Sequence, residues 1–122
     1  MSYIIRGKVI KGDGYGRKIG FPTANIDREY FSALAEKPKM GVYSGKVNVL
    51  GAGDSEEHRA GIIIGPLDDK KLPKIEAHLL DFDKDIYGKE VIFTIDKFIR
   101  EFMNFNTEKE LIAQIKKDLK KC

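Results

Sequence analysis

Two neighbouring segments near the start of the chain carry groups suited to phosphate oxygens. A glycine-rich run, Gly12-Asp13-Gly14-Tyr15-Gly16-Arg17-Lys18, is followed closely by Gly20-Phe21-Pro22-Thr23-Ala24-Asn25. Glycine backbone can approach a polyphosphate closely and direct several N–H groups at it, and the two basic side chains add positive charge. Pro22 restricts the backbone before Thr23, so the Thr23 hydroxyl and the Asn25 amide are held at a defined angle. The candidate nucleotide-binding residues are therefore Gly12, Gly14, Gly16, Arg17, Lys18, Gly20, Pro22, Thr23 and Asn25.

Neither of the two commonest phosphate-binding motifs is present in this region. A Walker A loop needs a glycine, four residues and then Gly-Lys-Ser/Thr, and the dinucleotide motif fails because Arg17 stands at its third glycine. Glycines of this spacing are also common in hairpin turns, and a threonine after a proline is commonly a local turn or cap. From the residues alone, this region is therefore either a phosphate site or an ordinary turn.

Glu76 is the other candidate for chemistry. It lies in the apolar segment Ile75-Glu76-Ala77-His78-Leu79, where alternation would place Glu76 and His78 on one face of a strand. A carboxylate on a face that lines a site can orient a substrate hydroxyl and accept its proton. The alternative for Glu76 is a solvated carboxylate on an exposed strand face. We interpret His78 either as a structural histidine or as one that supports a reacting residue, rather than as a base.

Short segments of alternating or β-branched character predict the sheet that positions these residues. The expected strands are residues 3–10, 41–50, 60–64, 74–81 and 90–98. Residues 51–54 and 65–69 are typical of turns, and Tyr87-Gly88-Lys89 would link two strands as a hairpin does. Because no helix intervenes between the strands, we expect an antiparallel sheet, and closure into a barrel would remove its exposed edges.

One helix is expected after the strands. Thr107 and Glu110 form a capping-box pattern. An apolar stripe follows on one helix face, formed by Leu111, Ile112, Ile115 and Leu119. This stripe should pack on the barrel. Residues 27–36 would form either a short helix or a loop, and the sequence does not choose between them.

Composition places the chain among ordinary globular proteins. At 122 residues it is expected to form one domain, 1–122, and 42% hydrophobic with 34% charged residues is typical of that class. The single cysteine, Cys122, excludes an intramolecular disulfide and a cysteine cluster for zinc. A net charge of +3, from 22 basic and 19 acidic residues, is a weak attraction for nucleic acid. Since the sequence shows neither a signal peptide nor a membrane span, we expect a cytoplasmic protein that does not bind membranes. We also expect a monomer that binds no nucleic acid.

The order of these motifs resembles the riboflavin kinase (flavokinase) family, as a stand-alone domain similar to the C-terminal domain of bifunctional bacterial riboflavin kinase/FAD synthetase. The glycine-rich loop and the Pro22-Thr23-Ala24-Asn25 segment carry the resemblance first. Further blocks that resemble the family are Gly41-Val42-Tyr43-Ser44-Gly45, Ile75 to Phe82, Asp85-Ile86-Tyr87-Gly88 and Arg100 to Phe105. Together the blocks cover the chain from Gly7 to Asp118.

The resemblance implies a fold and an activity. The fold would be all-β, a closed six-stranded antiparallel Greek-key barrel with one C-terminal α-helix, in agreement with the strand pattern. The activity would be transfer of the γ-phosphoryl group of ATP to the 5′-hydroxyl of riboflavin, which gives FMN and ADP. Riboflavin and ATP would be the substrates, and Mg²⁺ would be the metal cofactor.

The resemblance also implies which residues act. The matching positions in this chain are Glu76 for the catalytic base, Thr23 and Asn25 for Mg²⁺, and Arg100, Phe102 and Phe105 for the flavin. Without the resemblance, phenylalanines that precede an amphipathic helix would be interpreted as core residues. The chain departs from the family pattern at Ile63, where the family usually has asparagine, and at Phe102, where it often has glutamate. The resemblance implies that the departure at Ile63 affects ATP contacts and the departure at Phe102 a polar contact to the flavin, so both concern binding groups rather than reacting ones.

Two other function classes stay open. A barrel that binds flavin or nucleotide without turnover, as a sensor or regulator, is suggested by the two departures. A nucleic-acid-binding barrel is suggested only by the basic excess and the strand pattern, and aromatic residues interleaved on a basic sheet are not evident. Turnover separates an enzyme from the first alternative, and salt-dependent oligonucleotide binding would support the second.

Overall fold

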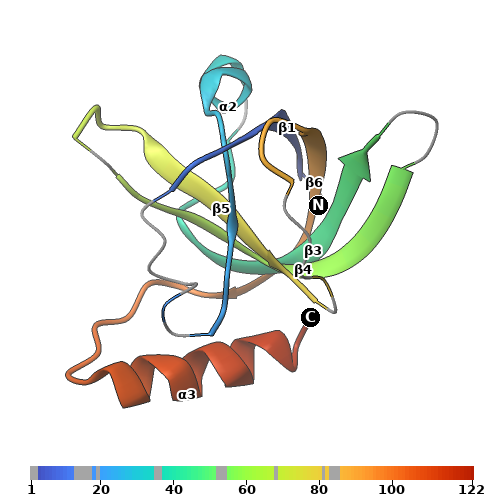
Figure 1. Cartoon of the computed structure of the whole chain (residues 1–122). Coiled ribbons are helices and arrows are strands. Elements are labelled where there is room, and N and C mark those ends of the chain that lie inside the picture. The colour runs from blue at the N-terminus through green and yellow to red at the C-terminus, as the bar shows by residue number, and fades with distance from the viewer. Residues whose placement is uncertain are drawn as a thin grey trace.

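The fold of the chain is described from a computed structural model. Placement is described for residues 3–12, 18, 20–34, 37–51, 55–67, 69–80, 82 and 86–122. These residues form the strands β1 (Tyr3–Ile10), β2 (Ala24–Ile26), β3 (Gly41–Leu50), β4 (Ser55–Leu67), β5 (Pro73–Leu79) and β6 (Glu90–Arg100), and the helices α2 (Glu29–Ala33) and α3 (Glu108–Leu119). In Figure 1 the strands curve around a barrel, with α2 at one end and α3 lying across the other.

The strands close into an antiparallel barrel in the order β1-β2-β5-β4-β3-β6. Strands β3, β4 and β5 are successive neighbours, and β6 returns to pair with the other side of β3. Three consecutive neighbours with a fourth strand beside the first make a Greek key. β1 then joins β6 to β2 and closes the ring. The expected closed six-stranded antiparallel Greek-key barrel is confirmed.

β2 is the strand that the residue pattern did not reveal. It has three residues, Ala24–Ile26, and follows closely after Pro22. Because proline removes a ladder donor and three residues show no period, only the family resemblance implied a sixth strand. The short strand lies between β1 and β5, so it brings the Pro22–Asn25 segment into the sheet.

The expectation of a turn at residues 65–69 is wrong for residues 65–67. β4 continues to Leu67, which pairs with Pro73 after a register shift that follows Ile64. Gly65 permits this irregularity because its φ of 103° is a conformation in which a Cβ would clash. Of the other expected turn, at 51–54, residues 52–54 lie outside the described residues.

Tyr87-Gly88-Lys89 is not a hairpin turn, so the expectation that this segment links two paired strands is wrong. β5 and β6 are not neighbours in the barrel, so the segment cannot join paired strands. It pairs instead with β1. The Val9 N–H donates to the Lys89 carbonyl at 2.9 Å, and the Gly88 N–H donates to the Val9 carbonyl at 3.0 Å.

Alternation along the strands sends apolar side chains into the barrel, where they form its core. The largest fully buried side chains are Phe93, Ile5, Ile26, Ile62, Ile64, Ile75, Ile95, Val47 and Val91. Tyr43 joins this core, with its hydroxyl donating to the Lys39 carbonyl at 2.6 Å and its ring edge-on to Phe98 at 5.2 Å. Among the described residues, side chains fill the interior of this small barrel, as expected for its size.

α3 begins at the expected capping box. The Thr107 hydroxyl accepts a hydrogen bond from the Glu110 N–H at 3.2 Å, and the Glu110 carboxylate accepts one from the Asn106 N–H at the same distance. The helix packs on the outside of β4, where a Cβ at Gly61 would lie 3.2 Å from Leu119 Cδ2. Of the undecided segment 27–36, residues 29–33 form α2, so the short helix is the correct alternative. Among the described residues, no helix combines the length and the apolar character needed to cross a membrane.

Candidate active site

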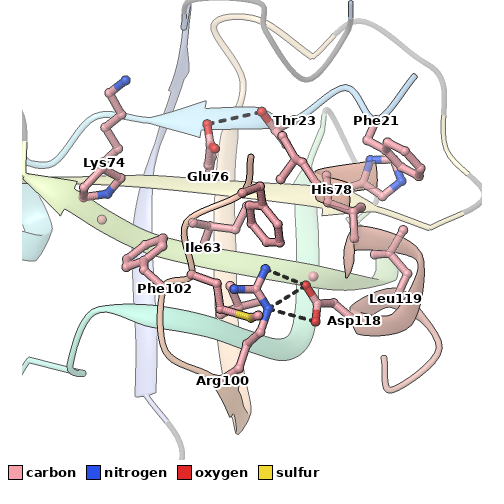
Figure 2. A pocket seen from close by; sticks show the side chains of 18 residues that line it. Phe21, Thr23, Ile63, Lys74, Glu76, His78, Arg100, Phe102, Asp118 and Leu119 are labelled. Atoms are coloured by element: carbon pink, nitrogen blue, oxygen red, sulfur yellow. Dashed lines mark hydrogen bonds and ion pairs between the residues drawn. The ribbon is translucent and has the colours of Figure 1, made fainter. Parts of the chain in front are cut away.

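Thr23 and Glu76 meet on the outer face of the barrel. Along β5 every second side chain is buried, so Glu76 and His78 point outward, as the alternation predicted. The Thr23 hydroxyl donates a hydrogen bond to Glu76 Oε2 at 3.3 Å (Figure 2), which joins two residues 53 positions apart. A hydroxyl and a carboxylate from different strands are thereby brought into one polar cluster.

Asn25 lies on the same outer face. In the pairing of β2 with β5, Asn25 is the partner of Glu76. Directly opposed residues of an antiparallel pair project to the same side of a sheet, so Asn25 extends the cluster along β2. Gly12 lies against it, because a Cβ at Gly12 would come 2.6 Å from Asn25 Cγ and 2.9 Å from its Oδ1. The chain at Gly12 therefore passes directly over the Asn25 amide, where a larger residue does not fit.

The other predicted phosphate-binding residues are divided by the structure. Lys18 and Gly20 are exposed, and Gly20 has a φ of 93°. Pro22 is half-buried, and His78 Nδ1 donates a hydrogen bond to its carbonyl at 2.7 Å. Gly14, Gly16 and Arg17 lie outside the described residues. The residues that the structure brings together are thus Gly12, Pro22, Thr23, Asn25 and Glu76.

A cavity of about 310 Å³ opens beside Glu76, between the barrel wall and α3 (Figure 2). Thr23, Lys74 and Glu76 give it one polar edge, and Ile63 of β4, the register partner of Glu76, forms part of its floor. The opposite side comes from the end of β6, the segment after it and α3, namely Arg100, Phe102, Met103, Phe105, Leu111, Ile115, Asp118 and Leu119. A largely apolar cavity with a few polar groups is the usual form of a small-molecule site.

Arg100, a predicted flavin contact, is held by Asp118. Its Nε lies 3.0 Å from both carboxylate oxygens of Asp118, and its Nη2 lies 2.8 Å from Oδ2. The two side chains are only 16% and 6% exposed, and Gln114 Nε2 donates a further bond to Asp118 Oδ1 at 3.0 Å. This ion pair ties α3 to the end of β6, so Arg100 forms a fixed part of the cavity wall.

Phe102 and Phe105 also line the cavity, but neither is a core residue. Phe102 is 42% exposed, and Phe105 is half-buried with its ring centroid 6.0 Å from the guanidinium of Arg100. The Phe102 ring lies over Gly65, where a Cβ would come within 3.0 Å of it. The core interpretation fits Phe98 instead, which packs on Tyr43.

Some residues that line the cavity were not predicted from the sequence. Lys74 precedes Glu76 by two residues on the same strand, so the alternation that placed Glu76 would also have found Lys74. Asp118 gave no signal, because nothing in the sequence relates it to Arg100, 18 residues earlier. Phe21 was noted only as part of its segment, although its ring lies edge-on to His78 at 5.7 Å and lines the cavity.

Comparisons with known proteins point to one family. A family model described as "Flavokinase: Riboflavin kinase" matches residues 1–122. A bifunctional riboflavin kinase/FMN adenylyltransferase of Listeria monocytogenes is 42% identical over 118 residues, which cover 95% of this chain and 36% of that protein. The RNA-binding riboflavin kinase RibR of Bacillus subtilis is 38% identical over 119 residues, which cover 95% of this chain and 48% of that protein. The crystal structure of riboflavin kinase from Trypanosoma brucei matches with a TM-score of 0.73 at 28% identity, covering 98% of this chain and 76% of that one.

This chain spans between a third and a half of the length of these two curated relatives. The family match nevertheless extends over every residue of the chain, and a solved riboflavin kinase shares its barrel. The chain therefore belongs to the flavokinase (riboflavin kinase) family.

Proposed function

We propose that this protein transfers the γ-phosphoryl group of ATP to the 5′-hydroxyl of riboflavin and releases FMN and ADP. The observation that carries the proposal is the hydrogen bond between Thr23 and Glu76 at the polar edge of the 310 Å³ cavity. In the proposed reaction Glu76 would be the proton acceptor, between an apolar site for a flat ring system and the oxygen ligands of Thr23 and Asn25. Membership of the riboflavin kinase family supports the same reaction.

The flavin would occupy the apolar part of the cavity. Phe102 and Phe105 would contact the isoalloxazine ring, and Ile63 would lie beneath it. Arg100 would contribute a guanidinium whose direction is set by Asp118. In this pose the ribityl chain would extend toward Glu76, where Thr23, Lys74 and Glu76 offer partners for its hydroxyl groups.

The nucleotide and Mg²⁺ would bind on the other side of Glu76. The phosphates would lie along Gly12, Gly14, Gly16, Arg17, Lys18, Gly20 and Pro22. Thr23 and Asn25 fit Mg²⁺ because hydroxyl and amide oxygens are hard ligands, and a Cβ at Gly12 would displace the Asn25 amide from its present position. When bound, the ion neutralises charge on the transferring phosphates.

Glu76 would act as the catalytic base. Its carboxylate accepts the proton of the riboflavin 5′-hydroxyl while that oxygen forms a bond to the γ-phosphorus and the bond from phosphorus to the β-γ bridging oxygen breaks. ADP takes the electrons of the broken bond and leaves. The hydrogen bond from Thr23 supports this role, because it would help to hold the carboxylate beside the substrate hydroxyl.

The proposal is tested with purified protein, ATP, Mg²⁺ and riboflavin, by measuring FMN with HPLC. Glu76→Gln should lower kcat by about 10²- to 10⁴-fold, the usual contribution of a general base, while the riboflavin KM changes little. Glu90→Gln is the matched control, because Glu90 pairs with Arg6 at an exposed site and does not line the cavity. Unchanged turnover in Glu76→Gln would remove the base assignment. Riboflavin binding by the wild type without any FMN would favour the sensor alternative instead.

The remaining expectations extend this proposal to partners and location. We expect a monomer that acts in the cytoplasm on riboflavin and ATP without binding nucleic acid. One relative carries RNA binding in its name, and this chain spans 48% of it. An oligonucleotide titration at two salt concentrations is therefore the direct test, and steeply salt-dependent binding would overturn the expectation.

A further inference from the structure

The ladder between β2 and β5 is interrupted beside the active site. It comprises two residue pairs, Ala24 with Ala77 and Asn25 with Glu76. Continuing this register by one residue would place Thr23 opposite His78. The ladder cannot continue in the usual way, because Pro22 has no N–H to donate. Thr23 therefore lies just before the three-residue strand β2, outside its ladder with β5.

His78 supplies a hydrogen bond at the place where the backbone ladder stops. Its Nδ1 lies 2.7 Å from the Pro22 carbonyl oxygen, a short bond between residues 56 positions apart. A carbonyl oxygen only accepts, so Nδ1 carries the hydrogen and donates it. Phe21 packs edge-on against the same imidazole at 5.7 Å. The ring thus fixes the backbone immediately before Thr23.

The contact that depends on this placement is a long one. The Thr23 hydroxyl reaches Glu76 at 3.3 Å, whereas O–H···O bonds usually lie between about 2.5 and 3.0 Å. A bond at that distance is lost with a small displacement of Thr23. Whether Thr23 contacts Glu76 therefore depends on where the Pro22 peptide is held.

We infer that His78 is a positioning residue for the proposed phosphoryl transfer: it anchors the Pro22 carbonyl so that Thr23 stays within reach of Glu76. The inference rests on the proposed function and adds a residue to it. His78 does not act on the substrate in this scheme. Its Nδ1 hydrogen is committed to Pro22, and its effect reaches Glu76 only through Thr23.

Three substitutions at one position test which ring nitrogen matters. The amide nitrogen of asparagine lies at about the place of Nδ1, whereas that of glutamine lies nearer Nε2. His78→Leu and His78→Gln should each lower kcat by about tenfold, as expected for loss of one hydrogen bond, with riboflavin KM changed less than about twofold. His78→Asn should restore turnover to within about threefold of the wild type. Rescue by glutamine to the same extent as by asparagine would overturn the inference.

A double-mutant cycle shows whether His78 acts through Thr23. In a Thr23→Val background, His78→Leu should lower kcat by less than about twofold further, because the contact that it positions is already gone. If the two effects multiply in full, His78 acts by another route and the inference fails. The asparagine and glutamine variants keep this test decisive even if the leucine variant does not fold, since both retain an amide at position 78.

Amide hydrogen exchange measured by NMR tests the anchor without any turnover. In His78→Leu, the amides of Thr23 and Ala24 should exchange about tenfold faster, while the core amide of Ile62 keeps its rate. If the wild type makes no FMN, the proposed function fails, and the exchange rates still decide whether His78 holds the segment. Unchanged exchange at Thr23 and Ala24 would overturn the inference whatever the activity.

Discussion

Removing the Asp118 carboxylate should destabilise the protein far more than removing the carboxylate charge of Glu90 from a surface ion pair. Arg100 and Asp118 are 16% and 6% exposed and lie 2.8 Å apart, whereas Arg6 and Glu90 are 56% and 52% exposed and lie 2.6 Å apart. The shorter pair is the weaker one in energetic terms, because water screens it and solvates either charge alone. Burial rather than distance therefore decides the expected difference.

The magnitude follows from what each substitution leaves behind. Asp118→Ala leaves the Arg100 guanidinium without the partner of its Nε and Nη2 bonds, and breaking a buried pair in this way costs about 3–5 kcal/mol. Arg100 keeps 16% of its side chain in water, so we expect the lower end, about 3 kcal/mol. Glu90→Gln should cost no more than about 1 kcal/mol. A typical domain has only about 5–15 kcal/mol in all, so the first change is a large fraction of it.

Urea denaturation followed by circular dichroism measures both changes. At an m value of about 1.5 kcal/mol/M, Asp118→Ala should lower the midpoint by about 2 M, and Glu90→Gln by less than about 0.7 M. The double variant Arg100→Met/Asp118→Leu separates charge from packing. It should recover most of the lost stability, because two apolar side chains leave no unpaired charge buried.

Equal effects of Asp118→Ala and Glu90→Gln would refute this reasoning, since burial would then not distinguish the pairs. A double variant as unstable as Asp118→Ala would refute the second step, and would mean that the geometry of the pair rather than its buried charge stabilises α3. The m values must stay constant for either comparison, because a changed m value indicates a changed unfolded or native state.

Two further predictions concern single residues. Gly12→Ala should weaken MgADP binding, measured by calorimetry, by about tenfold or more, because the new Cβ would displace the Asn25 amide, a movable side-chain end. Gly88→Ala is the control. It costs about 1–2 kcal/mol of backbone strain at a φ of 80°, but its Cβ contacts nothing, so MgADP affinity should stay unchanged. Burial, and to a lesser extent the nearby Tyr3, raises the pKa of Tyr43. The folded state then disfavours the tyrosinate, so the stabilisation is complete below about pH 10 and is lost as pH rises through the folded pKa. In Tyr43→Phe the free energy of unfolding should fall less steeply above pH 10 than in the wild type, and an identical slope would contradict the pKa shift.

Much of the fold could be predicted because the signals are local. Alternation identified five of the strands, and the Thr107–Glu110 capping box located α3. The pattern failed where the barrel imposes an irregularity. β2 is too short to show a period, and β4 passes through Gly65 and Pro66 by a register shift that sequence signals interpret as a turn. The strand order that separates β5 from β6 is a property of the closed ring, which no local segment encodes.

The candidate site shows the same division. The outward direction of Glu76 was predictable from period-two alternation within β5. Its contact with Thr23 was not, because it depends on the pairing of two strands distant in sequence. The pairing of Arg100 with Asp118 likewise needed the docking of α3. The residue types and the strand faces were predictable from the sequence, whereas the contacts between distant residues follow only from the tertiary structure.

A filled barrel constrains how such a site is built. Because the interior holds only core side chains, the outward faces of β4 and β5 supply the floor and one wall of the cavity, and α3 with the segment before it supplies the other. Polar contacts across the sequence hold both walls, among them His78 to Pro22 on one side and Arg100 to Asp118 on the other. The two contacts are therefore separable: loosening the first should lower kcat through Thr23 and Glu76, whereas loosening the second should raise the riboflavin KM through Phe102 and Phe105.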